Sequence, residues 1–193
     1  MTSFVLYLVR HGEPEGAGRL IGRTDAMPTA RGIAACVDQA RDLEAEVLIA
    51  SDLSRARLAA EAIGRESGVP LSIDPRWREL DFGAWDGLAP AEVDGAALSR
   101  FWDDPDGHAP PGGECWSALV HRVTSAAADL AARPTLVVTH GGAMRAALAV
   151  LCGFDMRQTW ALDLPYSGLL SLRVWPAGGP NQRPTAQIVG LYP

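Results

Sequence analysis

A short, uninterrupted apolar run, Phe4–Val9, lies near the start of the sequence and stops abruptly on Arg10, His11 and Gly12. A strand that is apolar without alternation is buried on both faces, as in a parallel sheet covered by helices. Such a strand has no structural reason to end on an arginine and a histidine. This junction therefore indicates a functional site at the end of a buried strand.

Similar apolar runs recur along the chain, with stretches of helical spacing between them. We expect strands at Phe4–Val9, Glu46–Ser51, Leu71–Ile73 and Thr135–Thr139, and two late strands at residues 169–175 and 186–192 separated by PAGGPNQRPT. We expect a helix after the capping residue Thr29 and two more from about Ser54 to Gly68 and from about Ala91 to Trp102. A long helix should follow the apolar stripe from Trp116 to Leu130. The last should begin after a tight His140-Gly141-Gly142 turn and end at Gly153.

Strands that alternate with helices predict an α/β fold. We expect a doubly wound, mostly parallel central sheet with helices on both faces, a three-layer α/β/α arrangement, and a C-terminal edge hairpin. The length of 193 residues is enough for one hydrophobic core, so we expect a single domain over residues 1–193.

Charge and cysteine usage restrict the partners and the compartment. A net charge of −6 argues against a general nucleic-acid or anionic-membrane surface, and no apolar run approaches a membrane span. The cysteines, Cys36, Cys115 and Cys152, are isolated from one another, which favours a reducing compartment. We therefore expect a cytoplasmic protein without nucleic-acid or membrane partners; the oligomeric state stays open.

In parallel sheets, ligands bind beyond the carboxyl ends of the strands. Arg10 and His11 follow the first expected strand, Arg55 lies shortly after the second, and His140 follows the strand at Thr135–Thr139. If these strands are neighbours, two guanidinium groups and two imidazoles converge on one crevice. Arginine gives planar, bidentate, permanently charged contacts to phosphate, so the crevice suits a phosphate group.

An imidazole in such a crevice can also act as a nucleophile. With Nδ1–H fixed on a backbone carbonyl, the free Nε2 can attack phosphorus in line, and the cations stabilise the charge that develops on the phosphoryl oxygens. The leaving alkoxide then needs a proton donor. Glu79, in the aromatic-rich RELDFGAWDG stretch, is the first candidate, ahead of Glu13, Glu114 and Asp81.

These residues resemble the histidine phosphatase superfamily, in its phosphoglycerate-mutase-like branch. The resemblance rests on five motifs in the order of the family: LVRHGE (8–13), SDLSRA (51–56), RELDFGAWDG (78–87), PPGGE (110–114) and VVTHGG (137–142). It implies that His11 is phosphorylated, that Arg10, Arg55, His140 and the adjacent Gly141 form the phosphate pocket, and that Glu79 is the proton donor. Another branch has an aspartate where this chain has Gly141, which leaves the acid role to Glu79.

The chain also departs from the family pattern. Ala17 replaces an asparagine expected among the phosphate contacts, and Leu58-Ala59 replaces a usual Gln-Thr pair. The chain lacks room for the substrate-covering insertions usual in the mutases, which favours hydrolysis over transfer. IGRTDAMPTARG (21–32) and PPGGE look most like the α-ribazole phosphatases.

The resemblance implies a phosphomonoesterase that needs no cofactor. Metal ligation is disfavoured because neither His11 nor His140 has a second histidine or cysteine at helical spacing. The alternatives are a phosphoglycerate-mutase-type transferase and a phosphate-binding regulatory module without turnover. The expected partner is a small phosphomonoester. Contact of Trp85 or Trp102 with an aromatic substrate stays open.

Overall fold

The computed structural model describes residues 2–179 and 183–193. Within them one sheet has the strand order β3-β2-β4-β1-β5-β6. The four strands from β3 to β1 are parallel, β5 is antiparallel to β1, and β6 is antiparallel to β5. The strand bounds are β1 Phe4–Arg10, β2 Val47–Ala50, β3 Leu71–Ile73, β4 Thr135–Thr139, β5 Leu169–Trp175 and β6 Thr185–Tyr192.

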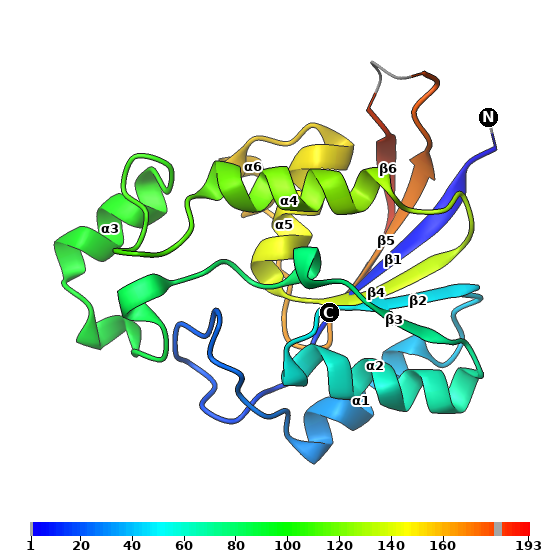
Figure 1. Ribbon diagram of the computed structural model, residues 1–193, viewed down its shortest axis with the longest axis horizontal. Helices are drawn as coiled ribbons and strands as arrows, with labels where there is room; N and C mark the ends of the chain where they lie inside the picture. The colour runs from blue at the N-terminus through cyan, green and yellow to red at the C-terminus, as the bar shows by residue number, and fades with distance from the viewer. Residues whose placement is uncertain (1, 180–182) are drawn as a thin grey trace.

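Helices cover both faces of this sheet (Figure 1). One face carries α1 (Ala30–Ala40) and α2 (Ser54–Ser67), and the other carries α4 (Trp116–Ala128) and α5 (Gly141–Cys152). The short α6 (Met156–Thr159) follows α5, while α3 (Gly95–Asp103) lies far to one side of the sheet. The predicted three-layer α/β/α fold is confirmed, and the mostly parallel sheet becomes antiparallel at β5 and β6.

The central strands are buried on both faces, as their unbroken apolar runs predict. Leu8 packs in the cluster with α4 and α5, and the next residue, Val9, packs in the cluster with α1 and α2. Val137 and Val138 of β4 divide in the same way. Because successive strand side chains point to opposite faces, each central strand contributes to both halves of the core.

Several local predictions are confirmed by the chain's own capping groups. The Thr29 hydroxyl accepts the N–H of Gly32 at the start of α1, and α2 ends at Gly68 with a left-handed φ of 74°. The two late strands pair as an antiparallel hairpin, with β6 at the sheet edge. Residues 180–182 of their predicted connection lie outside the described part of the chain.

Two predicted boundaries are wrong. The helix expected from Ala91 starts at Gly95, because the Asp94 carboxylate accepts the N–H of Ala97 and a separate 3₁₀ turn occupies Pro90–Glu92. The expected tight turn at His140 is absent, since α5 begins directly at Gly141 with His140 as its N-cap. Two consecutive glycines therefore start a helix here.

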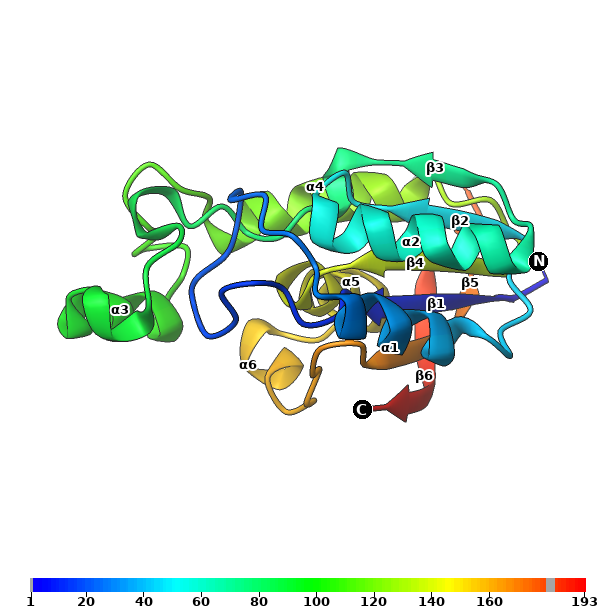
Figure 2. The same cartoon turned by 90° about the horizontal axis from the view of Figure 1, so that it is seen from below.

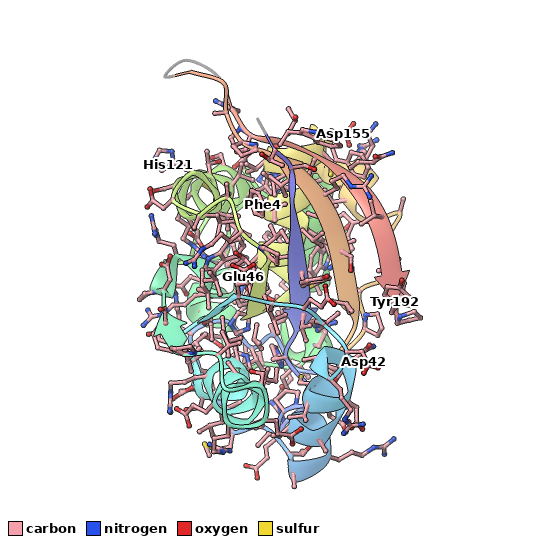
Figure 3. All side chains as sticks on the ribbon, turned by 90° about the vertical axis from the view of Figure 1, so that its right-hand side faces the viewer. Phe4, Asp42, Glu46, His121, Asp155 and Tyr192 are labelled. Atoms are coloured by element: carbon pink, nitrogen blue, oxygen red, sulfur yellow. The ribbon has the colours of Figure 1, made fainter. Side chains whose placement is uncertain are left out.

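The parallel strands all point their carboxyl ends toward the α3 side of the molecule (Figure 2). Figure 3 shows the opposite end, where Phe4 at the start of β1 and Glu46 just before β2 face the viewer. The segment between β3 and α4, which includes α3, therefore extends beyond the strand ends. This places it where a parallel sheet binds ligands.

Arg122 of α4 holds the start of this segment in place. Its guanidinium makes two 2.8 Å hydrogen bonds to the Glu114 carboxylate. It also donates to the carbonyls of Arg76, Arg78 and Glu79 at 2.7–2.8 Å. The side chains of Arg122 and Glu114 are only 16% and 12% exposed, so the pair is largely removed from water.

We predict that Arg122→Met lowers the free energy of unfolding by about 3–5 kcal/mol, because it leaves a largely buried carboxylate and three carbonyls without their donor. Chemical denaturation measures the change. Arg41→Met is the matched control, since the ion pair of Arg41 with Asp38 is about 60% exposed and should contribute less than about 1 kcal/mol. Equal losses in the two variants would contradict this account.

Candidate active site

His11 lies directly after β1 and is 4% exposed. Its backbone N–H donates to the Thr139 carbonyl on β4, which brings it beside His140. The ring Nδ1 lies 2.7 Å from the Gly12 carbonyl, which can only accept, so Nδ1 carries the proton. The Nε2 of His11 therefore keeps its lone pair.

Glycines after β1 allow this arrangement. The backbone of Gly12 packs against the backbone of Gly32 in α1, and a Cβ on Gly12 would overlap the Gly32 carbonyl group. A Cβ on Gly32 would in turn press on Glu13. The two glycines therefore let α1 approach the loop that carries the His11 carbonyl partner.

His140 is fully buried at the N-cap of α5, with its ring centroid 5.0 Å from that of His11. Within the described part of the chain, neither of its ring nitrogens has a hydrogen-bond partner. Burial first, and then the nearby Arg55, lower the pKa of both His11 and His140 well below the ordinary histidine value. Both imidazoles are therefore neutral near pH 7.

Arg10 and Arg55 lie near the histidines, and each donates hydrogen bonds from its guanidinium to backbone carbonyls around the site. Arg10 donates through Nη1 to the Leu164 carbonyl at 2.7 Å and stacks 4.2 Å from the Tyr166 ring centroid. Arg55 is fully buried and donates through its two Nη atoms to the carbonyls of Ile21, Gly22 and Thr24. In both arginines, Nε has no partner among the described residues.

The loop that Arg55 holds is also fixed from its other side. The Asp86 carboxylate accepts the N–H groups of Gly22, Arg23 and Thr24 at 2.7–3.0 Å. Arg55 therefore satisfies the carbonyls of the loop while Asp86 satisfies its N–H groups. The same loop continues to Asp25, whose carboxylate caps α2 through the N–H and hydroxyl of Ser54.

Glu79 lies beside the start of α5. Its carboxylate accepts the N–H of Gly142 at 3.0 Å and the N–H of Leu80 at 2.9 Å. A Cβ on Gly142 would overlap Oε1 of Glu79, so the second glycine of the HGG motif makes room for the carboxylate. Glu114, a lower-ranked candidate acid, is engaged with Arg122 instead.

These groups line a cavity of about 250 Å³ at the carboxyl ends of β1 and β4. Its walls include Arg10, His11, Glu79 and Gly141. His140 and Arg55 do not line the cavity, but the His140 ring lies 5.0 Å from the His11 ring between centroids, and Arg55 is close enough to lower the pKa of His11. The structure thus brings all six sequence-predicted site residues together, with four of them on the cavity wall.

Sequence reasoning missed Arg145. It lies one turn after Gly141 on α5, lines the same cavity, and stacks 4.0 Å from the Trp160 ring centroid. Burial lowers its pKa, with Glu79 opposing the effect, and its Nε has no partner among the described residues. Arg145 lies four positions after Gly141, so the two share one face of a helix. That spacing is the signal in the sequence that could have identified Arg145.

The described residues contain no group of three or more His, Cys, Asp or Glu side chains arranged to hold a metal ion. Nor does any helix in residues 2–179 and 183–193 have the length and hydropathy needed to cross a membrane.

Comparison with known proteins identifies the family. A profile described as the histidine phosphatase superfamily (branch 1) matches residues 6–183. The chain belongs to this superfamily. The predicted resemblance is therefore confirmed, and so is the assignment to the phosphatase class of enzymes.

Two curated members of the superfamily are similar to the chain over most of its length. A glucosyl-3-phosphoglycerate phosphatase of Mycolicibacterium vanbaalenii is 36% identical over 169 residues, which cover 78% of this chain and 75% of the relative. A probable phosphoglycerate mutase of Salmonella paratyphi C is 33% identical over 170 residues, with 81% and 77% covered. The relatives thus carry more than one activity name.

Solved structures of superfamily members have the same fold. A mycobacterial glucosyl-3-phosphoglycerate phosphatase superposes with a TM-score of 0.81 at 26% identity and covers 96% of each chain. A putative α-ribazole-5'-P phosphatase from Escherichia coli has a TM-score of 0.83 at 24% identity, covering 100% of this chain and 97% of its own. At that identity the second likeness shows the fold alone.

We predict that Gly142→Ala lowers turnover of an alkyl phosphomonoester by about 100-fold or more, because the new Cβ displaces the Glu79 carboxylate from its position. Steady-state kinetics measure the loss. Gly95→Ala is the matched control, since a Cβ there meets no atom within 4 Å. If Gly142→Ala is as active as Gly95→Ala, the position of Glu79 beside α5 has no part in turnover.

Proposed function

We propose that the protein hydrolyses small phosphomonoesters without a metal, through a phosphohistidine on His11. The observation that carries the proposal is the hydrogen bond from Nδ1 of His11 to the Gly12 carbonyl, which leaves Nε2 free in a cavity flanked by cations. A neutral imidazole with one fixed nitrogen is ready to attack phosphorus.

In the first step, the Nε2 lone pair of His11 forms a P–N bond while the bond from phosphorus to the leaving oxygen breaks. Glu79 gives its proton to that oxygen, so the product leaves as an alcohol. Arg10, Arg55 and His140, with the backbone N–H of Gly141 where α5 begins, would bind the phosphoryl oxygens. Their fixed positions suit the charge that spreads over these oxygens in the transition state.

In the second step, water replaces the alcohol. The Glu79 carboxylate takes a proton from the attacking water molecule while the oxygen of that water forms a bond to phosphorus. The P–N bond breaks and its electron pair returns to Nε2, which restores His11. The hydrogen bonds from Gly142 and Leu80 hold the carboxylate at one place for both steps.

The alternative within the superfamily is phosphoryl transfer back to a substrate hydroxyl, as the name of the Salmonella relative suggests. We favour hydrolysis because the relative at 36% identity is named a phosphatase. The alternative of another class, a phosphate-binding module without turnover, is disfavoured because a nucleophile and a candidate acid are both positioned at the cavity.

The motif resemblance and the names of the relatives suggest candidates for the physiological substrate. α-Ribazole 5'-phosphate is a candidate from the motif resemblance, and glucosyl-3-phosphoglycerate is a candidate from the curated relative. We further propose one domain over residues 1–193, a cytoplasmic location and no nucleic-acid partner, all from the sequence.

We predict that the purified protein hydrolyses members of a phosphomonoester panel in excess chelator, and that vanadate inhibits it by mimicking phosphate. His11→Ala should show no turnover, while His140→Ala should retain a rate about 10²–10³-fold below wild type, since it loses one charge-stabilising group. Release of phosphate is the measurement. Loss of activity on chelation that added metal restores would refute the metal-independent mechanism, and transfer of phosphate between hydroxyls would favour the mutase alternative.

A further inference from the structure

We infer that the outer part of the cavity binds an apolar, aromatic leaving group against the surface that Trp102 and Trp160 form together. This inference rests on the proposed function, because it assigns the part of the substrate that leaves when His11 is phosphorylated. It selects among phosphomonoesters by the chemistry of the cavity wall.

The cavity has two chemically different ends. The end at β1 and β4 carries Arg10, His11 and Glu79. The remaining wall contains Arg19, Arg145 and Tyr166, but most of it consists of large apolar side chains, among them Phe82, Phe101, Trp102, Trp116, Met156 and Trp160. Among the described residues that line it, none is Ser, Thr, Asn, Gln or Asp, the neutral and acidic groups that commonly bind the hydroxyls of a sugar.

This composition favours an apolar leaving group. A polyol or sugar would exchange its bonds with water for contacts with rings that offer few hydrogen-bonding atoms, which is unfavourable for each hydroxyl left unpaired. An aromatic ring gains from the same wall, because burial removes its apolar surface from water and ring pairs add a further attraction.

Two tryptophans from distant parts of the chain meet at this wall. Trp102 belongs to α3 and Trp160 follows α6, yet their ring centroids are 5.3 Å apart in an edge-to-face arrangement of 86°. They are 42% and 49% exposed, although both are large and apolar. Exposed apolar surface that continues into a cavity marks a binding surface.

Both indoles rest on fixed neighbours. Trp102 contacts the ring of Phe101 at 4.7 Å, and Phe101 is 3% exposed within the core. The Arg145 guanidinium lies 4.0 Å from the Trp160 centroid, and Arg145 itself lies close to Gly141 at the other end of the cavity. The aromatic wall is thus preorganised and connected to the phosphate end, which lowers the entropy lost on binding.

Trp85 does not take part in this surface. It is 9% exposed and packs edge-to-face on Phe101 at 5.8 Å, on the core side. Of the two tryptophans left open by the sequence, the structure assigns the substrate contact to Trp102. The cavity volume of about 250 Å³ restricts the leaving group to one that carries one or two rings.

The test compares 3-phenylpropyl phosphate with n-propyl phosphate. The two leaving alcohols are similarly basic, so the need for Glu79 is the same and the difference in kcat/KM reports binding of the ring. We expect wild type to prefer the phenylpropyl ester by about 10- to 100-fold, the value for burial of one aromatic group. In Trp102→Ala and Trp160→Ala this preference should fall to within about threefold.

The control is Trp175→Ala on β5, which removes a tryptophan of similar exposure, 39%, that does not line the cavity, and should keep the wild-type preference. Glycerol phosphate hydrolysed as efficiently as the phenylpropyl ester would overturn the inference. So would a phenylpropyl preference that survives both cavity variants.

Binding of the matching phosphonates separates this inference from the proposed function. Phosphonates have a C–P bond that the enzyme does not cleave, so their dissociation constants report ring binding without turnover. Tighter binding of 3-phenylpropylphosphonate than of propylphosphonate, lost in Trp102→Ala, supports the aromatic site even if no ester is hydrolysed, in which case the proposed function alone fails. Equal binding of the two phosphonates overturns the inference whatever the hydrolysis.

Discussion

The hydrogen bond from Nδ1 of His11 to the Gly12 carbonyl decides which ring nitrogen is available at the cavity, and the surrounding structure depends on it. The accepting carbonyl belongs to Gly12, whose backbone packs so closely against Gly32 of α1 that neither position has space for a side chain. The parallel pairing of β1 with β4 then brings His140 to within 5.0 Å of His11, ring centroid to ring centroid. One local contact thus fixes the tautomer, while the sheet fixes the neighbours.

The arginines of the site serve two purposes at once. Arg55 gives both Nη atoms to the carbonyls of the loop at residues 21–24, and Arg10 gives Nη1 to the Leu164 carbonyl. In both, Nε has no partner among the described residues. A guanidinium has five N–H donors in a rigid plane, so carbonyls that hold one edge also orient the other. Burial of these cations beside two neutral imidazoles creates a positive environment that an anion would stabilise.

The sequence predicted which residues follow the buried strands, because buried strands and strand-end residues leave clear local signals. Their convergence was conditional on the strands being neighbours, which the order β2-β4-β1 satisfies. Thr29, Gly68 and the run Thr135–Thr139 behave in the structure as their residue types predict. The sequence did not predict the cavity positions of Arg145 and Trp160 or the bonds of Arg122, because each depends on tertiary contacts. Arg145 and Trp160 line the cavity with Arg10 and Trp102, and Arg122 donates to the carbonyls of residues 76, 78 and 79. The HGG motif was misjudged as a turn, since the reason for Gly142 is the Glu79 carboxylate, 63 positions away.

The most direct test of the central claim is the chemical identity of the covalent intermediate. Rapid mixing with a reactive phosphomonoester, followed by quenching in base and ³¹P NMR of the denatured protein, distinguishes phosphate on Nε2 from phosphate on Nδ1. Peptide mapping then gives the residue. We expect a single Nε2 phosphohistidine at His11. Phosphate on Nδ1, on His140 or on a carboxylate, or a reaction course without any phosphoenzyme, would contradict it.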